Sequence, residues 1–400
     1  MPPVIPTAIP PRRLIAILAL LTAFGPLATD TYLPALPDMR GDLGGSASGV
    51  AASLSVFFFG MAAGQLIYGP ISDRFGRKVP LMIGTAVFTL AAFAACFARG
   101  IEAFVALRLV QSLGGACGLT LARAVVRDLY DADELAKAFA ALTLIGMITP
   151  LVAPTLGVGI IMLGGWRAIF AVMTGMGIIT MAAIAFGLPE TLPVDRRHAE
   201  ITIGGVIGNF ARIITRRRFT LLAMMAGSAA GTLFSFITGS AEAFMTEFAY
   251  TKPQYTFVFT AITVAMMAGG EANRRLVRHF SPPELLRFAL TANVVSGLAL
   301  VGAAGFGPGW SVALALGAAV GMLGLILPNS ATLAIGSLRR DAGSGSSLLG
   351  VIQFGLGFVA SSGVAWFQNG TALPMALGVA GCAVMGRLCL AVLPHEERPA

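Results

Sequence analysis

Long apolar runs separated by short polar stretches dominate this chain of 400 residues. A helix needs about 20 mostly apolar residues to cross roughly 30 Å of hydrocarbon, and it satisfies its own backbone hydrogen bonds there. The pattern predicts twelve such helices, six on each side of a polar stretch. The expected ranges are 13–36, 49–70, 79–98, 101–126, 137–163 and 166–188, then 219–241, 255–273, 284–306, 310–335, 344–367 and 371–393.

The two groups of six helices have nearly equal lengths, which is typical of a transporter built from an internal repeat. We therefore predict an all-α membrane protein with an N-terminal six-helix half at 1–188, a cytoplasmic linker at 189–218 and a C-terminal six-helix half at 219–400. The apolar run behind Arg12 and Arg13 also resembles a signal peptide. Because the run is long and continues at 30–34 as a broken helix, we interpret it as the first span.

Positive charge alternates from loop to loop, and this bias orients membrane proteins. The basic residues expected on one side are Arg12, Arg13, Arg74, Arg77, Lys78, Arg127, Lys137, Arg196, Arg197, Arg212, Arg216, Arg217, Arg218, Arg274, Arg275, Arg278, Arg287, Arg339, Arg340 and Arg398. The opposite side is expected to hold Arg40, Arg99, Arg167 and Lys252. The bias predicts that both termini are cytoplasmic, and the even number of spans agrees with that.

Composition excludes a soluble globular protein and a disordered one. Apolar residues make up 56% of the chain and charged residues 12%, about half the charged share of soluble domains, whereas disorder requires low hydrophobicity. The net charge of +8 lies in the loops, so we expect no nucleic-acid partner. The four cysteines lie inside apolar runs and the three histidines in loops, so we expect no disulfide framework, metal site or catalytic residue.

Two ionisable residues are predicted at membrane depth, where charge is costly and usually functional. Asp30 lies in the outer part of the first span and Arg108 in the fourth, and the two could form an ion pair. Gly25, Pro26 and Pro34 break the helix around Asp30, and broken backbone at this depth is tolerated where it lines a cavity. We favour a titrating carboxylate in a central cavity over a structural ion pair.

Other residues are weaker candidates. Polar and aromatic side chains that either line a substrate cavity or join helices are Tyr32, Gln111, Phe234, Glu242, Asn329 and Gln353. Glu242 falls at the outer end of its span, where it could instead be solvated. Pro150 and Pro154 on one face of the fifth span predict a bend with close packing. Gly69 and Gly76 permit a tight reversal with close helix approach after the second span.

Several stretches resemble a known family. Residues 69–78, GPISDRFGRK, are similar to the loop signature GxLaDrxGrk of the major facilitator superfamily. The chain resembles more narrowly the Bcr/CflA family of drug exporters, over about residues 13–390. The stretches that carry this are ATDTYLPALP at 28–37, LARAVVRDLY at 121–130, GWRAIF at 165–170, PETLP at 189–193, LPN at 327–329 and SSLLGVIQFGLG at 346–357.

The resemblance implies proton-coupled export of small molecules across the bacterial inner membrane by alternating access, driven by the proton motive force without a cofactor. It implies that the Asp30 carboxylate couples proton movement to transport and that Arg108 tunes this carboxylate. A cytoplasmic latch for the outward-facing state is implied at Gly69, Asp73, Arg74, Gly76, Arg77 and Asp128. An antiporter motif is implied at Pro150, Pro154 and Gly157, although Thr149, Ala153 and Val158 replace three of the glycines usual in that motif.

The function predicted from the sequence is therefore drug/proton antiport. The expected substrates are small, largely apolar compounds such as phenicols, bicyclomycin-like or lipophilic compounds, and the other expected partners are protons and the lipid bilayer. We expect a monomer. An exporter or proton-coupled importer of a small metabolite is the alternative. A channel or membrane enzyme is less favoured, because neither a ring of pore-lining polar residues nor a nucleophile–base pair is evident.

Overall fold

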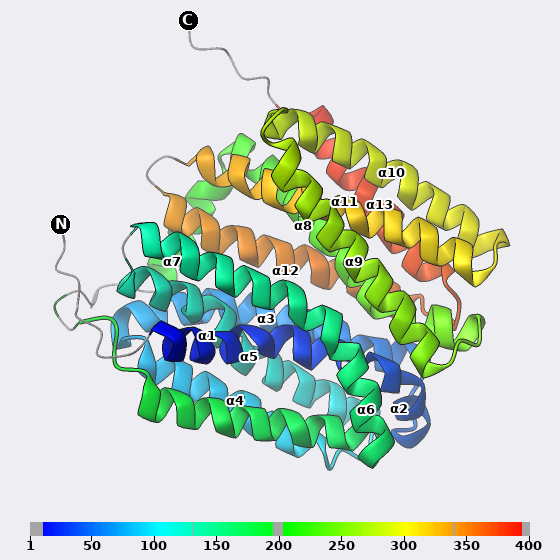
Figure 1. The fold of residues 1–400 in the computed structure, drawn as a ribbon, viewed down its shortest axis with the longest axis horizontal. Coiled ribbons are helices and arrows are strands. Elements are labelled where there is room, and N and C mark those ends of the chain that lie inside the picture. The colour runs from blue at the N-terminus through cyan, green and yellow to red at the C-terminus, as the bar shows by residue number, and fades with distance from the viewer. Residues whose placement is uncertain (1–10, 131, 194, 196–202, 339–340, 394–400) are drawn as a thin grey trace, which may run out of the picture. The chain divides into compact units, whose positions relative to one another are not determined.

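The computed structural model describes residues 11–130, 132–193, 195, 203–338 and 341–393, and in these ranges every element is a helix (Figure 1). The helices in chain order are α1 (Pro11–Asp30), η1 (Leu33–Ala35), α2 (Leu36–Asp42), α3 (Ala47–Phe75), α4 (Lys78–Ala95), α5 (Ile101–Leu129), α6 (Ala132–Gly187), α7 (Ile203–Ile214), α8 (Arg217–Ala241), the π-helical η3 (Glu242–Glu247), α9 (Lys252–Leu276), α10 (Pro282–Phe306), α11 (Gly309–Gly336), α12 (Ala342–Trp366) and α13 (Leu373–Ala391).

Eleven of the described helical segments are long and apolar enough to cross a membrane, and one of them holds two spans. The helix α6 has non-helical backbone angles at Gly164 and at Gly165, where φ is 69°. A positive φ is readily adopted only by glycine, so the chain reverses here and α6 comprises two helices. The predicted all-α architecture with twelve spans is therefore confirmed in the described part of the chain.

The contacts divide the chain into two compact units. The first unit is Met1–Val206 with Lys252–Thr256, and the second is Ile207–Thr251 with Phe257–Ala400. In the first unit α5 is central, since α1, α3 and α4 pack against it, and α6 packs against α1 and α4. In the second unit α8 is central, since α11, α12 and α13 pack against it, and α10 packs against α11 and α13.

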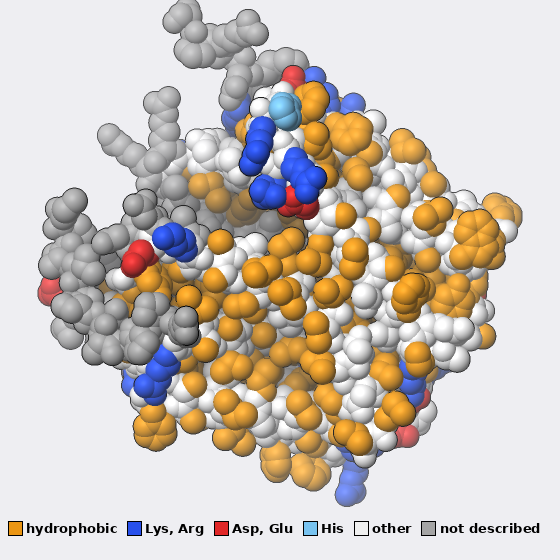
Figure 2. All heavy atoms as spheres, viewed as in Figure 1, with side chains coloured by type: hydrophobic (Ala, Val, Ile, Leu, Met, Phe, Trp, Pro, Cys, Tyr) orange, Lys and Arg blue, Asp and Glu red, His pale blue; other side chains and the backbone are white. Residues whose placement is uncertain are grey.

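The surface has the character of a membrane protein. On the face shown in Figure 2, hydrophobic side chains cover the middle and charged side chains gather at the edges. Large apolar side chains that would be costly in water are exposed on several helices, among them Leu163 at 90% and Phe306 at 99%.

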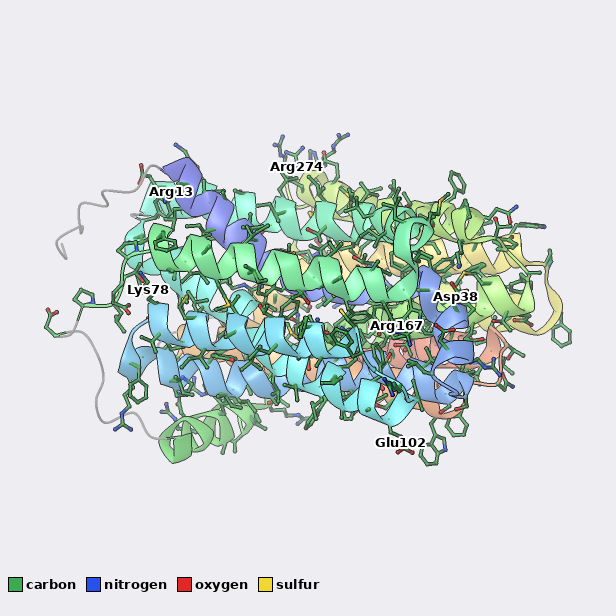
Figure 3. All side chains as sticks on the ribbon, turned by 90° about the horizontal axis from the view of Figure 1, so that it is seen from below. Arg13, Asp38, Lys78, Glu102, Arg167 and Arg274 are labelled. Carbon is green, nitrogen blue, oxygen red and sulfur yellow. The ribbon has the colours of Figure 1, made fainter. Side chains whose placement is uncertain are left out.

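Charged side chains also mark the ends of the helices in the first unit. Figure 3 shows Arg13 and Lys78 at one end and Asp38, Glu102 and Arg167 at the opposite end, which is the arrangement that the loop pattern predicts. Several residues used for the orientation lie outside the described residues, namely Arg196, Arg197, Arg339, Arg340 and Arg398, and the side chain of Arg12 is not described either.

Candidate functional site

The end of α1 places a carboxylate in the interior of the first unit. Pro26 lies one turn before the end of this helix, which stops at Asp30, and the short helix η1 with Pro34 follows. The side chain of Asp30 is 2% exposed, and its Oδ1 accepts a hydrogen bond of 2.8 Å from the hydroxyl of Thr29. Helix α1 runs through Gly25 and Pro26 without a break, so the predicted interruption occurs only after Asp30, where a turn at residues 31 and 32 separates α1 from η1.

Arg108 on α5 is completely buried beside the same stretch of α1. Its Nη1 donates to Oε1 of Gln111 at 2.5 Å, and its Nη2 donates to the backbone carbonyl of Ala28 at 2.7 Å. The second bond ends two residues before Asp30. Gln111, one of the predicted cavity residues, thus orients the guanidinium of Arg108 and also contacts the Met173 sulfur at 3.6 Å.

Three aromatic rings complete the environment of the guanidinium. The Cζ atom of Arg108 lies 4.3 Å from the ring centroid of Phe57, 4.7 Å from that of Tyr32 and 5.8 Å from that of Phe170. Such cation–π contacts contribute roughly 2 kcal/mol when they are desolvated. The hydroxyl of Tyr32 shares a hydrogen bond of 2.9 Å with Ser53 on α3. We call Tyr32, Phe57 and Phe170 the aromatic box.

The ion pair considered between Asp30 and Arg108 is not formed. Among the described residues, no basic nitrogen lies within 4.0 Å of the Asp30 carboxylate, whose hydrogen bond comes from Thr29. The reason is that a carbonyl and an amide oxygen take two Arg108 donors while the aromatic box covers its faces. The sequence pattern identified both charged residues, but it did not indicate which residues each of them contacts.

The predicted reversal after the second span is shorter than expected. Helix α3 continues to Phe75, and α4 begins at Lys78. Gly76 makes the turn with φ of 89°, a conformation that other residues rarely adopt. Gly69 lies inside α3, and a Cβ atom there would meet nothing within 4 Å. The expected close helix approach at Gly69 is therefore absent.

Arg77 joins three elements at this end of the first unit. Its Nε donates to Oδ2 of Asp128 at 2.8 Å, and its Nη1 donates to Oδ1 of Asp73 at 2.6 Å and to the Ser72 hydroxyl at 2.7 Å. Burial lowers the pKa of Arg77, but the hydrogen bonds and charges of Asp128 and Asp73 outweigh it, so the pKa lies above its ordinary value. Arg77 therefore stays charged at any physiological pH. We call Arg77, Asp73 and Asp128 the latch.

Arg74, also assigned to the latch by resemblance, points elsewhere. Its side chain is exposed, and its guanidinium lies 5.3 Å from the ring centroid of Phe75. The structure thus brings Asp73, Arg77 and Asp128 together and leaves Arg74 outside their hydrogen-bond network.

The antiporter motif lies where α6 meets the break in α1. Pro150 and Pro154 are inside α6, and Pro154 is buried. A Cβ atom at Gly157 would overlap the backbone carbonyl of Thr31, the residue that follows Asp30. The missing side chain thus permits direct contact between the two backbones next to the buried carboxylate.

The remaining cavity candidates belong to the second unit, each on a different element. The ring centroid of Phe234 on α8 lies 5.4 Å from that of Phe354. Glu242, the first residue of η3, is 3% exposed, so it is not simply solvated. Asn329 on α11 donates to Oδ1 of Asn273 at 2.6 Å, a bond between helices. Gln353 is partly exposed on α12.

Several residues that contact Arg108 or the latch in the structure are not indicated by the sequence pattern. Phe57 and Phe170 are among 26 phenylalanines, and nothing in the linear pattern separates ring contacts with arginine from ordinary packing. Glu190 and Thr191 lie in the PETLP stretch, which carries part of the family resemblance but predicts no role for either residue. Both contact the latch region.

Comparison with known proteins places this geometry in a class. The profile of the Major Facilitator Superfamily matches residues 18–362. A bicyclomycin resistance protein homolog from Haemophilus influenzae is 31% identical over 93% of both chains. A chloramphenicol resistance protein from Pseudomonas aeruginosa is 28% identical over 80% of this chain and 77% of that protein. The crystal structure of a D-xylose–proton symporter has the same fold, with a TM-score of 0.74 at 13% identity over 96% of this chain and 97% of that one.

The helices, the buried charges and these likenesses define a multi-pass membrane transporter rather than an enzyme. The chain belongs to the major facilitator superfamily and, within it, to the Bcr/CflA family.

Proposed function

We propose that this protein is a drug/proton antiporter of the bacterial inner membrane, which exports small, largely apolar compounds by alternating access. The observation that carries the proposal is the buried Asp30 carboxylate at the break of α1. The names of the two relatives, which refer to bicyclomycin and chloramphenicol resistance, support the substrate class. The proton motive force supplies the energy, and no cofactor takes part. The protein acts as a monomer, because one chain holds both six-helix halves.

In this mechanism Asp30 carries the proton. Its carboxylate accepts a hydrogen bond from the Thr29 hydroxyl and has no counter-ion within the described residues. Protonation therefore neutralises a buried charge without breaking an ion pair. A proton from the outer side and a substrate from the cytoplasm then compete for the charged carboxylate.

Arg108 supplies a fixed positive charge to the same region. The aromatic box and the carbonyl of Ala28 hold the guanidinium in one place, so its field acts on Asp30 in every cycle. Because the interior screens charge weakly, this fixed charge forms part of the electrostatic environment in which Asp30 exchanges its proton. The latch biases the exchange between states from the opposite side of the membrane.

The decisive substitution is Asp30→Asn, which keeps the shape of the side chain and removes its titration. In an efflux-deficient bacterium we expect the wild-type chain to raise tolerance to phenicols, bicyclomycin or lipophilic cations, and the variant at equal expression to abolish this tolerance. Glu102→Gln is the matched control, because Glu102 is an exposed carboxylate on α5. Drug-induced proton movement in inverted vesicles should vanish with Asp30→Asn and persist with Glu102→Gln.

Two results would contradict the proposal. Export by Asp30→Asn with unchanged pH dependence would remove Asp30 from proton coupling. Failure of the wild-type chain, present in the membrane, to confer tolerance to any compound would instead favour transport of a metabolite.

A further inference from the structure

The segment that follows α6 contacts the latch from a distant part of the sequence. Glu190 Oε1 accepts a hydrogen bond of 2.7 Å from the backbone N–H of Arg77, and its Oε2 accepts one of 3.3 Å from the backbone N–H of Lys78. The carboxylate also turns back on its own segment, because Oε1 accepts a bond of 3.0 Å from the N–H of Leu192. Glu190 is thus held in place on both sides.

Glu190 lies at the N-terminus of α4, where the helix lacks a side-chain cap. This helix begins at Lys78, and the preceding residue, Arg77, provides no side-chain cap of its own. The first N–H groups of a helix lack partners within it, and a negative charge there is favoured by the helix dipole. Glu190 supplies this cap and at the same time fixes the backbone of Arg77, whose side chain forms the latch.

Thr191 holds the other side of the latch. Its side chain is buried, and its hydroxyl donates to Oδ2 of Asp128 at 3.3 Å. The same oxygen accepts the bond from Nε of Arg77. In addition, the ammonium group of Lys78 donates to the carbonyl of Ala185 near the end of α6 at 2.9 Å. The end of α6 and the residues after it therefore hold both the start of α4 and the end of α5.

We propose that Glu190 and Thr191 are positioning residues of the latch. Glu190 fixes the backbone of Arg77, and Thr191 fixes the Asp128 carboxylate that accepts the hydrogen bond from Arg77. The latch therefore forms in one geometry. The inference rests on the proposed function, because it takes the latch to control the exchange between transport states.

The first test measures the cap itself. Hydrogen exchange of the purified full chain, followed by mass spectrometry on peptides that contain residues 77 and 78, needs no substrate. Loss of a hydrogen bond to a charged group typically changes an equilibrium by at least about tenfold. We therefore expect Glu190→Ala to raise the exchange of these amides about tenfold. Glu190→Gln, which keeps one acceptor oxygen, should have a smaller effect.

The second test measures the latch. Spin labels at Lys137→Cys and Arg278→Cys, both exposed in the wild type, are placed in a chain without its native cysteines, and pulsed electron resonance gives the populations of states. We expect Glu190→Ala and Thr191→Val to shift these populations, and Thr191→Ser to restore them because it keeps the hydroxyl. Asp195→Asn is the control, since it removes an exposed carboxylate from the same stretch.

The outcomes separate the two proposals. Unchanged exchange in Glu190→Ala, or raised exchange with unchanged state populations, would overturn the positioning role and reduce Glu190 to a structural cap. If both readouts change as expected while the wild-type chain exports no drug, the inference stands and the proposed substrate class fails. For a substrate that is exported, the variants should lower the maximal rate and leave the KM unchanged.

Discussion

Arg108 shows how a membrane interior holds a charge without an opposite charge in contact. The guanidinium is planar and weakly hydrated, so its faces pack against rings while its edges donate hydrogen bonds. Both kinds of contact are present, with Phe57 at 4.3 Å from Cζ and the Ala28 carbonyl at 2.7 Å from Nη2. A lysine ammonium has neither the flat faces nor the forked donors.

Arg108→Lys therefore keeps the charge but loses its placement. We expect the maximal export rate to fall by at least about tenfold, which corresponds to about 1.4 kcal/mol, while the protein still reaches the membrane. The rate of drug-driven proton movement in vesicles measures this. Arg99→Lys is the matched control, because Arg99 is exposed. A variant that transports as fast as the wild type would show that charge alone suffices at position 108.

At this scale the sequence predicted which residues are unusual but not what they contact. Asp30 and Arg108 stand out because charges in apolar runs are rare. Their partners come from α1, α3, α5 and α6 and depend on side-chain directions that no linear pattern contains. The ion pair considered between them is the clearest case, since tertiary contacts gave Arg108 a carbonyl, an amide and three rings instead.

At the scale of elements, the contact between α6 and α1 depends on one missing side chain. A Cβ atom at Gly157 would overlap the Thr31 carbonyl, whereas a Cβ atom at Gly159, two residues further along α6, would meet nothing within 4 Å. Backbone cannot move aside as a flexible side chain can. Forcing atoms into such packing typically costs about 1–3 kcal/mol.

The substitution Gly157→Ala is accordingly expected to lower the thermal unfolding midpoint of the purified protein and to reduce export, since α1 must shift beside Asp30. Gly159→Ala is expected to leave export unchanged and to keep the midpoint or raise it slightly, because replacing Gly by Ala inside a helix is itself mildly stabilising. Fluorescence-detected unfolding in detergent gives the midpoints. Equal midpoints for the two variants would contradict the close approach of the helices.

The predicted helix ranges agree best with the observed helices where the length of the apolar run alone determines the ends of the helix. The sequence ranges for the later spans differ by few residues from the helices observed, for example 344–367 against Ala342–Trp366. Differences arise where helices leave the apolar runs, because polar residues also form helices outside the hydrocarbon. Helix α3 continues beyond the run to Phe75, and α2 extends the first span to Asp42.

The helix α7 lies inside the predicted linker, and its sequence carries a helical signal. Its apolar residues at 203, 206, 207, 210, 213 and 214 recur at helical spacing, and Phe210 and Ile213 are buried. The arginines on either side of it give the stretch the overall polar character that predicts a linker. In the second unit Arg212 and Arg216 both pair with Asp341, at 3.2 and 2.9 Å, and no sequence pattern indicates that carboxylate as their partner.

At the scale of the whole molecule, the orientation in the membrane rests on the bias of positive charge between alternate loops. Cys96, which ends α4 at the face predicted to be outside, offers a native reporter. Its thiol is half-buried, and its sulfur lies 3.7 Å from the carbonyl of Arg167. Among the other cysteines Cys117 is fully buried, and Cys382 and Cys389 are each 9% exposed.

Burial raises the pKa of the Cys96 thiol above its ordinary value, and the backbone hydrogen bond and Arg167 only partly oppose this. Because the thiolate is the reactive form, we expect slow labelling at neutral pH. The rate should rise by about tenfold per pH unit and level off at a higher pH than for a free cysteine. A membrane-impermeant maleimide should label intact spheroplasts and spare inverted vesicles, and Cys96→Ser should abolish the signal. Labelling confined to inverted vesicles would reverse the orientation and, with it, the side on which the latch and its positioning residues act.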